Sequence, residues 1–282
     1  MEKKYTLAEV NILIKTDFDF TDVERYAAFT SDFETPDLTY EFTTVETLPP
    51  LPEKPLYTDG GIVVSRSDGV TYRFYMHSRN SAYALLTDER IESGIITVRI
   101  SESELRYFRT EMRVFDTIAI EHAMALYHGT LLHSSFISYN GEAILFTAPS
   151  QTGKSTQAEL WRMHKGAQVI NGDRSLIKLK DGVLHAYSLP YCGTSGICEN
   201  YHAPIKTVVV LRQAPFNRIT RMRPAAAFRD IYEGCAANIW YERDMTAICD
   251  LVENIITTVP VYLLECLPDE DAVNTLFNVL NY

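Results

Sequence analysis

Hydrophobic residues alternate with polar ones through much of the first 112 residues, which is the pattern of strands with one buried face. Turn-forming residues separate these runs, and Asp68-Gly69 between two of them predicts a tight hairpin. The pattern predicts a β-rich N-terminal domain, residues 1–112, whose role it does not indicate. The expected strands are 8–14, 38–45, 61–65, 69–76 and 94–100.

From residue 113 onward, apolar residues at helical spacing alternate with short strand-like runs. Asn140-Gly141 and Asp181-Gly182 predict hairpins, which a doubly wound parallel sheet would not contain. We therefore expect an α/β domain with α+β character and a mixed sheet, residues 113–282. The expected helices are 114–127, 155–164, 224–240, 245–259 and one from 269. The expected strands are 131–138, 143–147, 168–171, 176–180, 183–187, 205–212, 217–222 and 261–267.

The most informative stretch follows the apolar strand 143–147 and leads into a helix. It reads Ala148, Pro149, Ser150, Gln151, Thr152, Gly153, Lys154, Ser155 and Thr156. A strand, a loop ending in Gly-Lys-Ser and a helix form a P-loop, in which backbone N–H groups and the helix N-terminus bind phosphate. Lys154 would then bind the β- and γ-phosphates of ATP, and the Ser155 hydroxyl would ligate Mg²⁺. The match is incomplete, because Ala148 stands where the consensus has its first glycine.

Two further side chains are expected beside this loop. Asp173 ends the next strand, where Mg²⁺ needs a carboxylate, although a turn aspartate is the alternative interpretation. His133 lies on the strand that precedes the loop strand, either as a proton relay or as a packed structural residue. The sequence thus offers His133 and Asp173 as catalytic candidates, and Ser155 and Asp173 as metal ligands.

Four other residues are candidates for a rim around the phosphate or its acceptor. Thr194 and Ser195 belong to a glycine-containing loop that either approaches a ligand closely or only connects two strands. Arg174 follows Asp173, and Arg218 lies in a basic stretch, residues 201–230, which is equally explained as a solvated face. The basic residues of this stretch are Lys206, Arg212, Arg218, Arg221, Arg223 and Arg229.

Composition narrows the class of protein. The net charge of −11 argues against general affinity for nucleic acid or anionic membranes, and residues 1–60 carry thirteen acidic against five basic residues. Five cysteines without a Cys-x-x-Cys motif suit neither a disulfide framework nor a zinc site. No apolar run approaches the roughly 18 residues of a membrane span, and the N-terminus lacks a signal-like region. We expect a cytoplasmic protein, with homo-oligomerisation left open.

Four features occur together after residue 113. His133 precedes Ala148 by fifteen residues; the Gly-Lys-Ser loop follows; Lys165-Gly166 leads through a strand to Asp173; and short antiparallel strands come next. In this combination the chain resembles the catalytic domain of HPr kinase/phosphorylase and the related serine kinases, including those that modify precursor peptides. This fold group also contains the ATP-dependent phosphoenolpyruvate carboxykinases.

The resemblance implies an ATP- and Mg²⁺-dependent kinase that phosphorylates a hydroxyl, most simply a serine of a peptide or protein. It implies that His133 and Asp173 act at the acceptor hydroxyl and the metal. Pro149 and Gly172 stand where HPr kinases tend to carry aspartate, so neither the phosphorylase reaction nor HPr as substrate follows. A nucleotide-binding regulatory protein without transfer activity and a small-molecule kinase are the alternatives.

Overall fold

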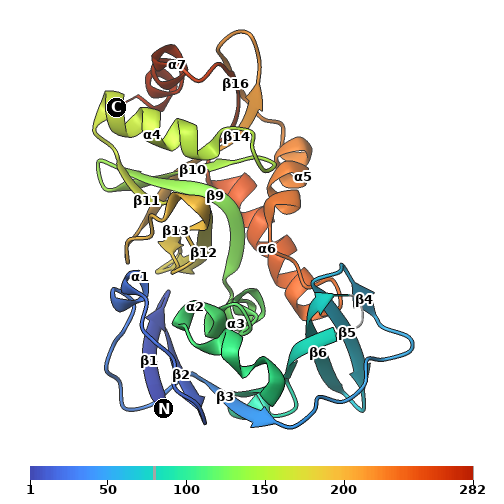
Figure 1. Ribbon diagram of the computed structural model, residues 1–282. Coiled ribbons are helices and arrows are strands. Elements are labelled where there is room, and N and C mark those ends of the chain that lie inside the picture. Colours follow the sequence, from blue (N-terminus) through green and yellow to red (C-terminus); the bar gives the residue numbers. More distant parts are fainter. Residues whose placement is uncertain (79–80, 282) are drawn as a thin grey trace. The chain divides into compact units, whose positions relative to one another are not determined.

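The computed structural model describes residues 1–78 and 81–281 (Figure 1). The chain divides into two compact units, Met1–Ala123 and Met124–Tyr282. The boundary expected after residue 112 falls inside helix α2 (Glu111–Phe115), whereas the division between the units falls inside helix α3 (Ile120–Leu126).

The first unit is rich in strands. Its elements before α2 are β1 (Glu2–Leu7), β2 (Val10–Thr16), α1 (Glu24–Ala27), β3 (Leu38–Val45), β4 (Tyr57–Thr58), β5 (Ile62–Ser67), β6 (Val70–Ser78), β7 (Ser81–Thr87), η1 (Ile91–Ser93), β8 (Ile95–Ser101) and η2 (Glu102–Phe108). Its described strands form one sheet in the order β1-β2-β3-β8-β7-β6-β5-β4. The β2–β3 and β3–β8 pairs are parallel and the others antiparallel, so the sheet is mixed.

Two predictions about this unit were wrong in detail. The pattern over 8–14 missed β1, because Ala8 and Glu9 form the left-handed turn of a β1–β2 hairpin. The single helix expected over 114–127 is broken into α2 and α3. Ala119 has a φ of +47° between them, a left-handed conformation that a right-handed helix cannot continue through.

The second unit contains the segment predicted to bind phosphate. Its elements after α3 are β9 (Thr130–Tyr139), β10 (Glu142–Thr147), α4 (Lys154–Lys165), β11 (Gln168–Asn171), β12 (Arg174–Lys180), β13 (Val183–Ser188), η3 (Gly193–Ser195), β14 (His202–Gln213), β15 (Arg218–Arg221), α5 (Pro224–Gly234), α6 (Glu242–Thr258), β16 (Val261–Cys266) and α7 (Glu270–Leu280). Helix α5 ends six residues before the predicted bound of 240, because the chain turns into extended structure at Cys235. No helix within residues 1–78 and 81–281 is both long and apolar enough to cross a bilayer.

The strand pairing of this unit closes on itself. β9 pairs with β10, β10 runs parallel to β14, β14 pairs with β13, β13 with β12, and β12 returns to β9. Both predicted hairpins are present, with positive φ at Asn140, Gly141, Asp181 and Gly182, as tight turns between antiparallel strands require. β16 extends the sheet from β14 in parallel, and β15 adds an antiparallel edge. The prediction of a mixed α/β fold is confirmed.

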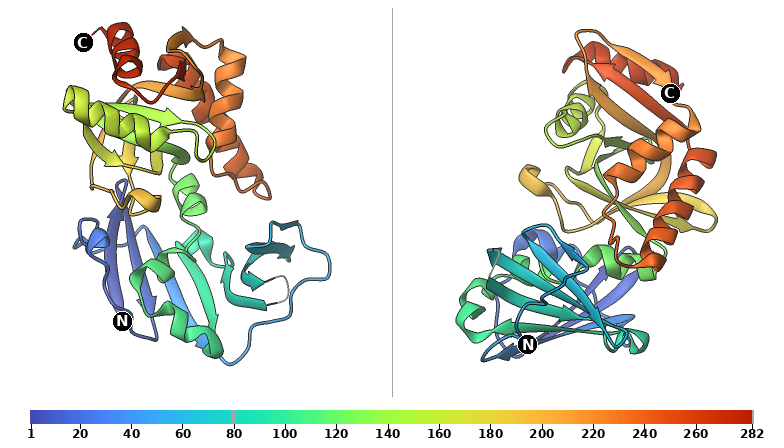
Figure 2. Two further views of the ribbon diagram at one scale, coloured as in Figure 1. Left: turned by 45° about the horizontal axis from the view of Figure 1, so that its top comes forward. Right: turned by 90° about the vertical axis from the view of Figure 1, so that its right-hand side faces the viewer.

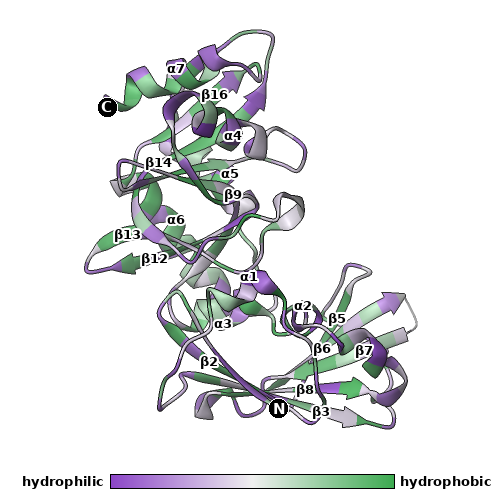
Figure 3. Ribbon diagram, turned by 60° about the vertical axis from the view of Figure 1, so that its left-hand side comes forward, coloured by the Kyte–Doolittle hydropathy of each residue, from purple (hydrophilic) through white to green (hydrophobic). Residues whose placement is uncertain are grey.

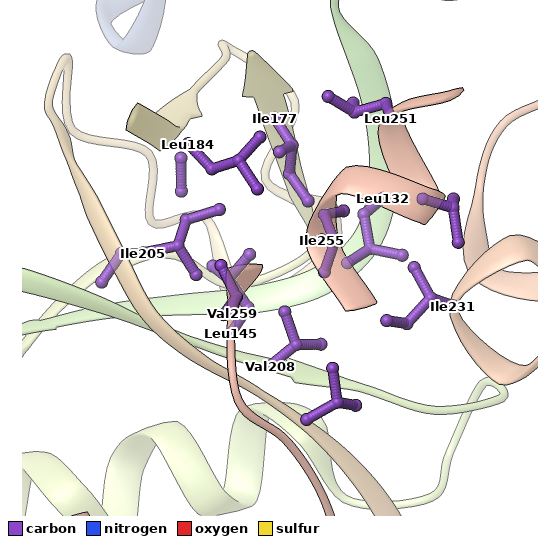
Figure 4. Packing of buried hydrophobic residues seen from close by; sticks show 14 of the residues in the cluster. Leu132, Leu145, Ile177, Leu184, Ile205, Val208, Ile231, Leu251, Ile255 and Val259 are labelled. Carbon is purple, nitrogen blue, oxygen red and sulfur yellow. The ribbon is translucent and has the colours of Figure 1, made fainter. Parts of the chain in front are cut away.

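Helices cover this sheet on both faces (Figure 2). Helices α5 and α6 bury Ile231 and Ile255 against Leu132, Leu145 and other strand residues, a cluster shown in Figure 4. A second cluster packs α4 and α7 against the other face. Figure 3 shows hydrophobic and hydrophilic residues on the same helix α7, which is the pattern of a helix with one face buried. Because β10 and α4 are each anchored in a core, the loop between them has fixed ends.

Candidate functional site

The loop from residue 148 to 153 joins β10 to α4 and folds around the Lys154 amine. Gln151 and Gly153 have φ values of +64° and +117°, so the backbone is left-handed at two positions of the loop. The Lys154 side chain is only 7% exposed, and its Nζ donates to the carbonyl oxygens of Ala148 at 2.9 Å and Pro149 at 3.3 Å. An ammonium group has three donors, so this amine can still donate toward a ligand above the loop.

His133 and Asp173 lie in contact beside this loop. Strand register places His133 opposite Arg174, the residue after Asp173. The His133 Nε2 atom is 3.3 Å from Asp173 Oδ1, and the Thr147 hydroxyl at the end of β10 donates to the His133 carbonyl. The side chains are 39% and 29% exposed, respectively, so both are accessible to a ligand.

Asn171 fixes the turn that carries Asp173, a role that the sequence analysis did not assign. Its Oδ1 accepts hydrogen bonds from the backbone N–H groups of Asp173 and Arg174, both at 3.0 Å. Its Nδ2 donates to the Ser188 hydroxyl and the Leu189 carbonyl. The Asn171 side chain is buried, so water does not compete for these four hydrogen bonds. Asn171 therefore fixes the conformation of the turn.

Ser155, the second predicted metal ligand, lies next to the same turn. Its hydroxyl is 3.3 Å from the carbonyl oxygen of Gly172, to which the Ser135 hydroxyl also donates at 3.1 Å. Ser155 and Asp173 are therefore both next to Gly172, the first through this hydrogen bond and the second along the chain. No group of three or more His, Cys, Asp and Glu side chains close enough to hold a metal ion occurs in the described part of the chain.

The charges of the site are coupled. The hydrogen bond from His133 holds the pKa of Asp173 below its usual value against the opposing effect of burial, and the positive charges of Arg174 and Lys154 lower it further. Burial lowers the pKa of Lys154, and the Asp173 carboxylate partly restores it. A bound anion would restore the Lys154 pKa in the same way, because it would compensate the desolvated ammonium.

The η3 loop packs against Asp173. A Cβ atom on Gly193, whose φ is +54°, would lie 2.8 Å from Asp173 Cγ, so only glycine fits there. The Ser195 hydroxyl is engaged within its own loop: it donates to the Cys192 carbonyl at 2.7 Å and accepts from the Ile197 N–H. The Thr194 side chain lies outside the described residues.

The two predicted rim arginines lie in different places. Arg174 contacts Asp173, with Nε 3.5 Å from Oδ2, and its guanidinium lies 5.8 Å from the centre of the Tyr191 ring. Arg218 lies on β15 and binds Glu265 on the neighbouring strand through two nitrogens at 2.5 and 2.9 Å. The structure brings Arg174 to the His133–Asp173 pair and leaves Arg218 outside the lining of the cavity described next.

A cavity of about 930 Å³, here called the loop cavity, opens above the 148–153 loop. His133 and Thr147 line this cavity, and so do Arg229, Asp230 and Glu233 of α5. A smaller cavity of about 280 Å³ adjoins it at His133 and reaches Asp173 and Arg174. The sequence did not indicate Asp230 and Glu233 as site residues, because hydrophobic periodicity predicts a helix but not the position of that helix relative to the loop.

Comparison with known proteins gives a family and a distant structural likeness. The solved structure of the HPr(Ser) kinase/phosphatase from Coxiella burnetii is 13% identical to this chain, covering 53% of this chain and 92% of that one with a TM-score of 0.30. No curated protein matches the chain. The family model described as SynChlorMet cassette protein ScmC matches residues 103–267. That segment is more than half of the sequence, and the chain therefore belongs to the ScmC family.

Proposed function

We propose that this protein is an ATP-dependent kinase that transfers the γ-phosphoryl group to a hydroxyl, in the first place a serine of a peptide or protein. The observation that carries the proposal is the arrangement of three features around two adjoining cavities. His133 and the loop residues 148–152 line the larger cavity, and Asp173 lines the smaller cavity beside His133. Lys154, at the start of α4, donates to the loop carbonyl oxygens. Each feature has a distinct part in phosphoryl transfer.

The loop and helix suit the phosphates of a nucleotide. The first N–H groups of α4 have no partner within the helix and carry its positive end, and the loop brings further N–H groups close to them. Lys154 adds a full charge from a side chain that is already desolvated. Phosphoryl transfer depends mainly on positioning and on stabilising negative charge, which is what these groups supply.

The His133–Asp173 pair suits the acceptor end. With His133 Nε2–H donating to Asp173, His133 Nδ1 is left as the proton acceptor. The acceptor hydroxyl would lose its proton to Nδ1 as its oxygen bonds to the γ-phosphorus, and the bond from that phosphorus to the β–γ bridging oxygen would break to release ADP. The carboxylate would stabilise the imidazolium that forms.

Mg²⁺ fits the oxygen donors of the site. The Ser155 hydroxyl and the Asp173 carboxylate both lie next to Gly172, and both are the hard oxygen ligands that this ion prefers. When bound, Mg²⁺ would neutralise charge on the β- and γ-phosphates. Ser155 would have to give up its contact with the Gly172 carbonyl to ligate the ion, or use its second lone pair.

Calorimetric titration with MgATP tests the nucleotide half of the proposal. Lys154→Ala should weaken binding strongly, about a hundredfold on the scale of a lost charge-assisted hydrogen bond, because it removes the buried cation at the loop. Lys54→Ala, which removes an exposed lysine of the first unit, is the matched control and should bind normally. Equal affinity of wild type and folded Lys154→Ala for ATP would end the proposal.

A further inference from the structure

The 148–153 loop borders a second cavity, whose lining includes the first turn of α4 and does not include His133. This side cavity has a volume of about 440 Å³, within the usual range of small-molecule sites, and is lined by Thr156, Gln157, Ala214, Cys266, Leu267 and Pro268. It shares Gln151, Thr152, Leu211 and Gln213 with the loop cavity, so the two spaces adjoin at the loop. A ligand held by the loop can extend into both.

The direction of transfer decides which part of a nucleotide enters which space. If the γ-phosphate faces His133 in the loop cavity, the nucleoside must leave the loop on the opposite side. Thr156, in the first turn of α4, lies on that side. The lining is largely apolar there, with Ala214, Leu267 and Pro268, which suits the flat face of a base better than a second charged group.

Gln157 adds chemical selectivity to this cavity. Its side chain is 2% exposed and its Oε1 has no hydrogen-bond partner among the described residues. Its Nε2 lies 3.5 Å from the Leu267 carbonyl oxygen and 3.4 Å from Cys266 Sγ. Because a carbonyl oxygen can only accept, the amide NH₂ must face Leu267, and this leaves Oε1 as the unused acceptor.

We propose that the side cavity binds the nucleobase and that Gln157 favours a 6-amino group over a 6-oxo group, an inference that rests on the proposed function. Gln157 Oε1 is enclosed by the protein, so the side chain must turn toward the cavity when the base enters. Oε1 and the Leu267 carbonyl oxygen can then accept from the two N–H donors of one amino group. A 6-oxo base would bring a third acceptor to the same place and leave Oε1 unpaired, which costs affinity. Adenine is therefore selected over hypoxanthine.

The direct test compares ATP with inosine triphosphate, which replaces the 6-amino group of ATP by an oxo group. Titration of the full chain with both nucleotides and Mg²⁺ should show ATP binding about tenfold more tightly, the size of one well-placed hydrogen bond. In Gln157→Leu the two affinities should become equal through loss of ATP affinity. Gln168→Leu, which removes an exposed amide at the start of β11, should keep the preference.

A second variant tests the place of the base without touching Gln157. Ala214→Phe fills the side cavity and should weaken ATP and inosine triphosphate together, while inorganic tripolyphosphate, which has no base, binds as in wild type. Equal wild-type affinity for the two nucleotides, or a preference that survives in Gln157→Leu, overturns the inference on Gln157. Failure of tripolyphosphate and both nucleotides to bind wild type overturns the proposed function, and the inference with it.

Discussion

At the scale of single residues, the contact between His133 and Asp173 favours the ionised form of the Asp173 carboxyl group. Asp173 stays ionised to a lower pH than a free aspartate because His133, Arg174 and Lys154 surround it with donors and positive charge. The sequence predicted this neighbourhood because the β9–β10 hairpin is local and only one helix separates Lys154 from Asp173. It could not predict Asn171 as the residue that holds the turn, because two of its four hydrogen-bond partners, Ser188 and Leu189, lie in a segment that only the folded structure brings close.

Replacing His133 should change the ionisation of Asp173. His133→Ala removes the largest contribution that lowers the Asp173 pKa, so this pKa should rise toward the usual value of about 3.9. Carbon-13 NMR titration of the labelled aspartate carboxyl groups measures this. His77→Ala, which removes a histidine paired with Glu104 in the first unit, is the control and should leave the Asp173 titration unchanged.

The same variant has a defined effect on stability. A carboxyl with a lowered folded-state pKa stabilises the protein above its unfolded-state pKa, and that contribution disappears as pH falls through the folded-state value. The difference in free energy of unfolding between wild type and His133→Ala should therefore be larger at pH 7 than at pH 3. A difference independent of pH in urea titrations would show that His133 stabilises the fold only through packing.

Asp173→Asn tests whether this carboxylate organises the metal. The amide keeps the shape of the side chain but loses the charge, so nucleotide affinity measured without Mg²⁺ should change little and the extra affinity given by Mg²⁺ should be lost. Transfer should be abolished. Near-normal turnover in Asp173→Asn would make Asp173 a structural turn residue and would require another metal ligand.

At the scale of elements, the η3 loop acts as a support for Asp173. Gly193→Ala would place a methyl group 2.8 Å from Asp173 Cγ, so the carboxylate must move away from His133. Gly196→Ala is the matched control, because its φ of +70° imposes similar backbone strain with no atom within 4 Å. Both variants should lose about 1 kcal/mol of stability, but only Gly193→Ala should also lose transfer activity. Equal transfer activity in the two variants would show that the η3 loop does not support the function of Asp173.

The elements differ in how far the sequence could predict them. Asn140-Gly141 and Asp181-Gly182 predicted hairpins correctly, because the turn residues alone determine that geometry. The break at Ala119 and the end of α5 at Gly234 were missed, because both depend on packing between distant segments. Gly234 shows this directly: an added Cβ would lie 3.0 Å from side chains of β9 and β10. The same crossing brings Asp230 and Glu233 over the loop.

At the scale of the whole molecule, the chain combines an acidic, β-rich unit with one that carries the candidate site. The sequence predicted the mixed α/β character from the alternation of hairpins and helices. It could not predict the closed pairing of β9, β10, β14, β13 and β12, because each link except the two hairpins joins strands that are distant in sequence.

The central claim, phosphoryl transfer to a hydroxyl, is tested most directly with ATP labelled at the γ-phosphate. The protein is incubated with this ATP, Mg²⁺ and a size-fractionated lysate of its source organism, with Lys154→Ala as the matched inactive control. The account predicts label on serine of a peptide or protein with wild type and none with the variant. Label on a small metabolite would show that the acceptor is a small molecule and not a peptide or protein. Confirmed ATP binding without label on any acceptor fraction would contradict the claim and leave a nucleotide-binding regulatory protein.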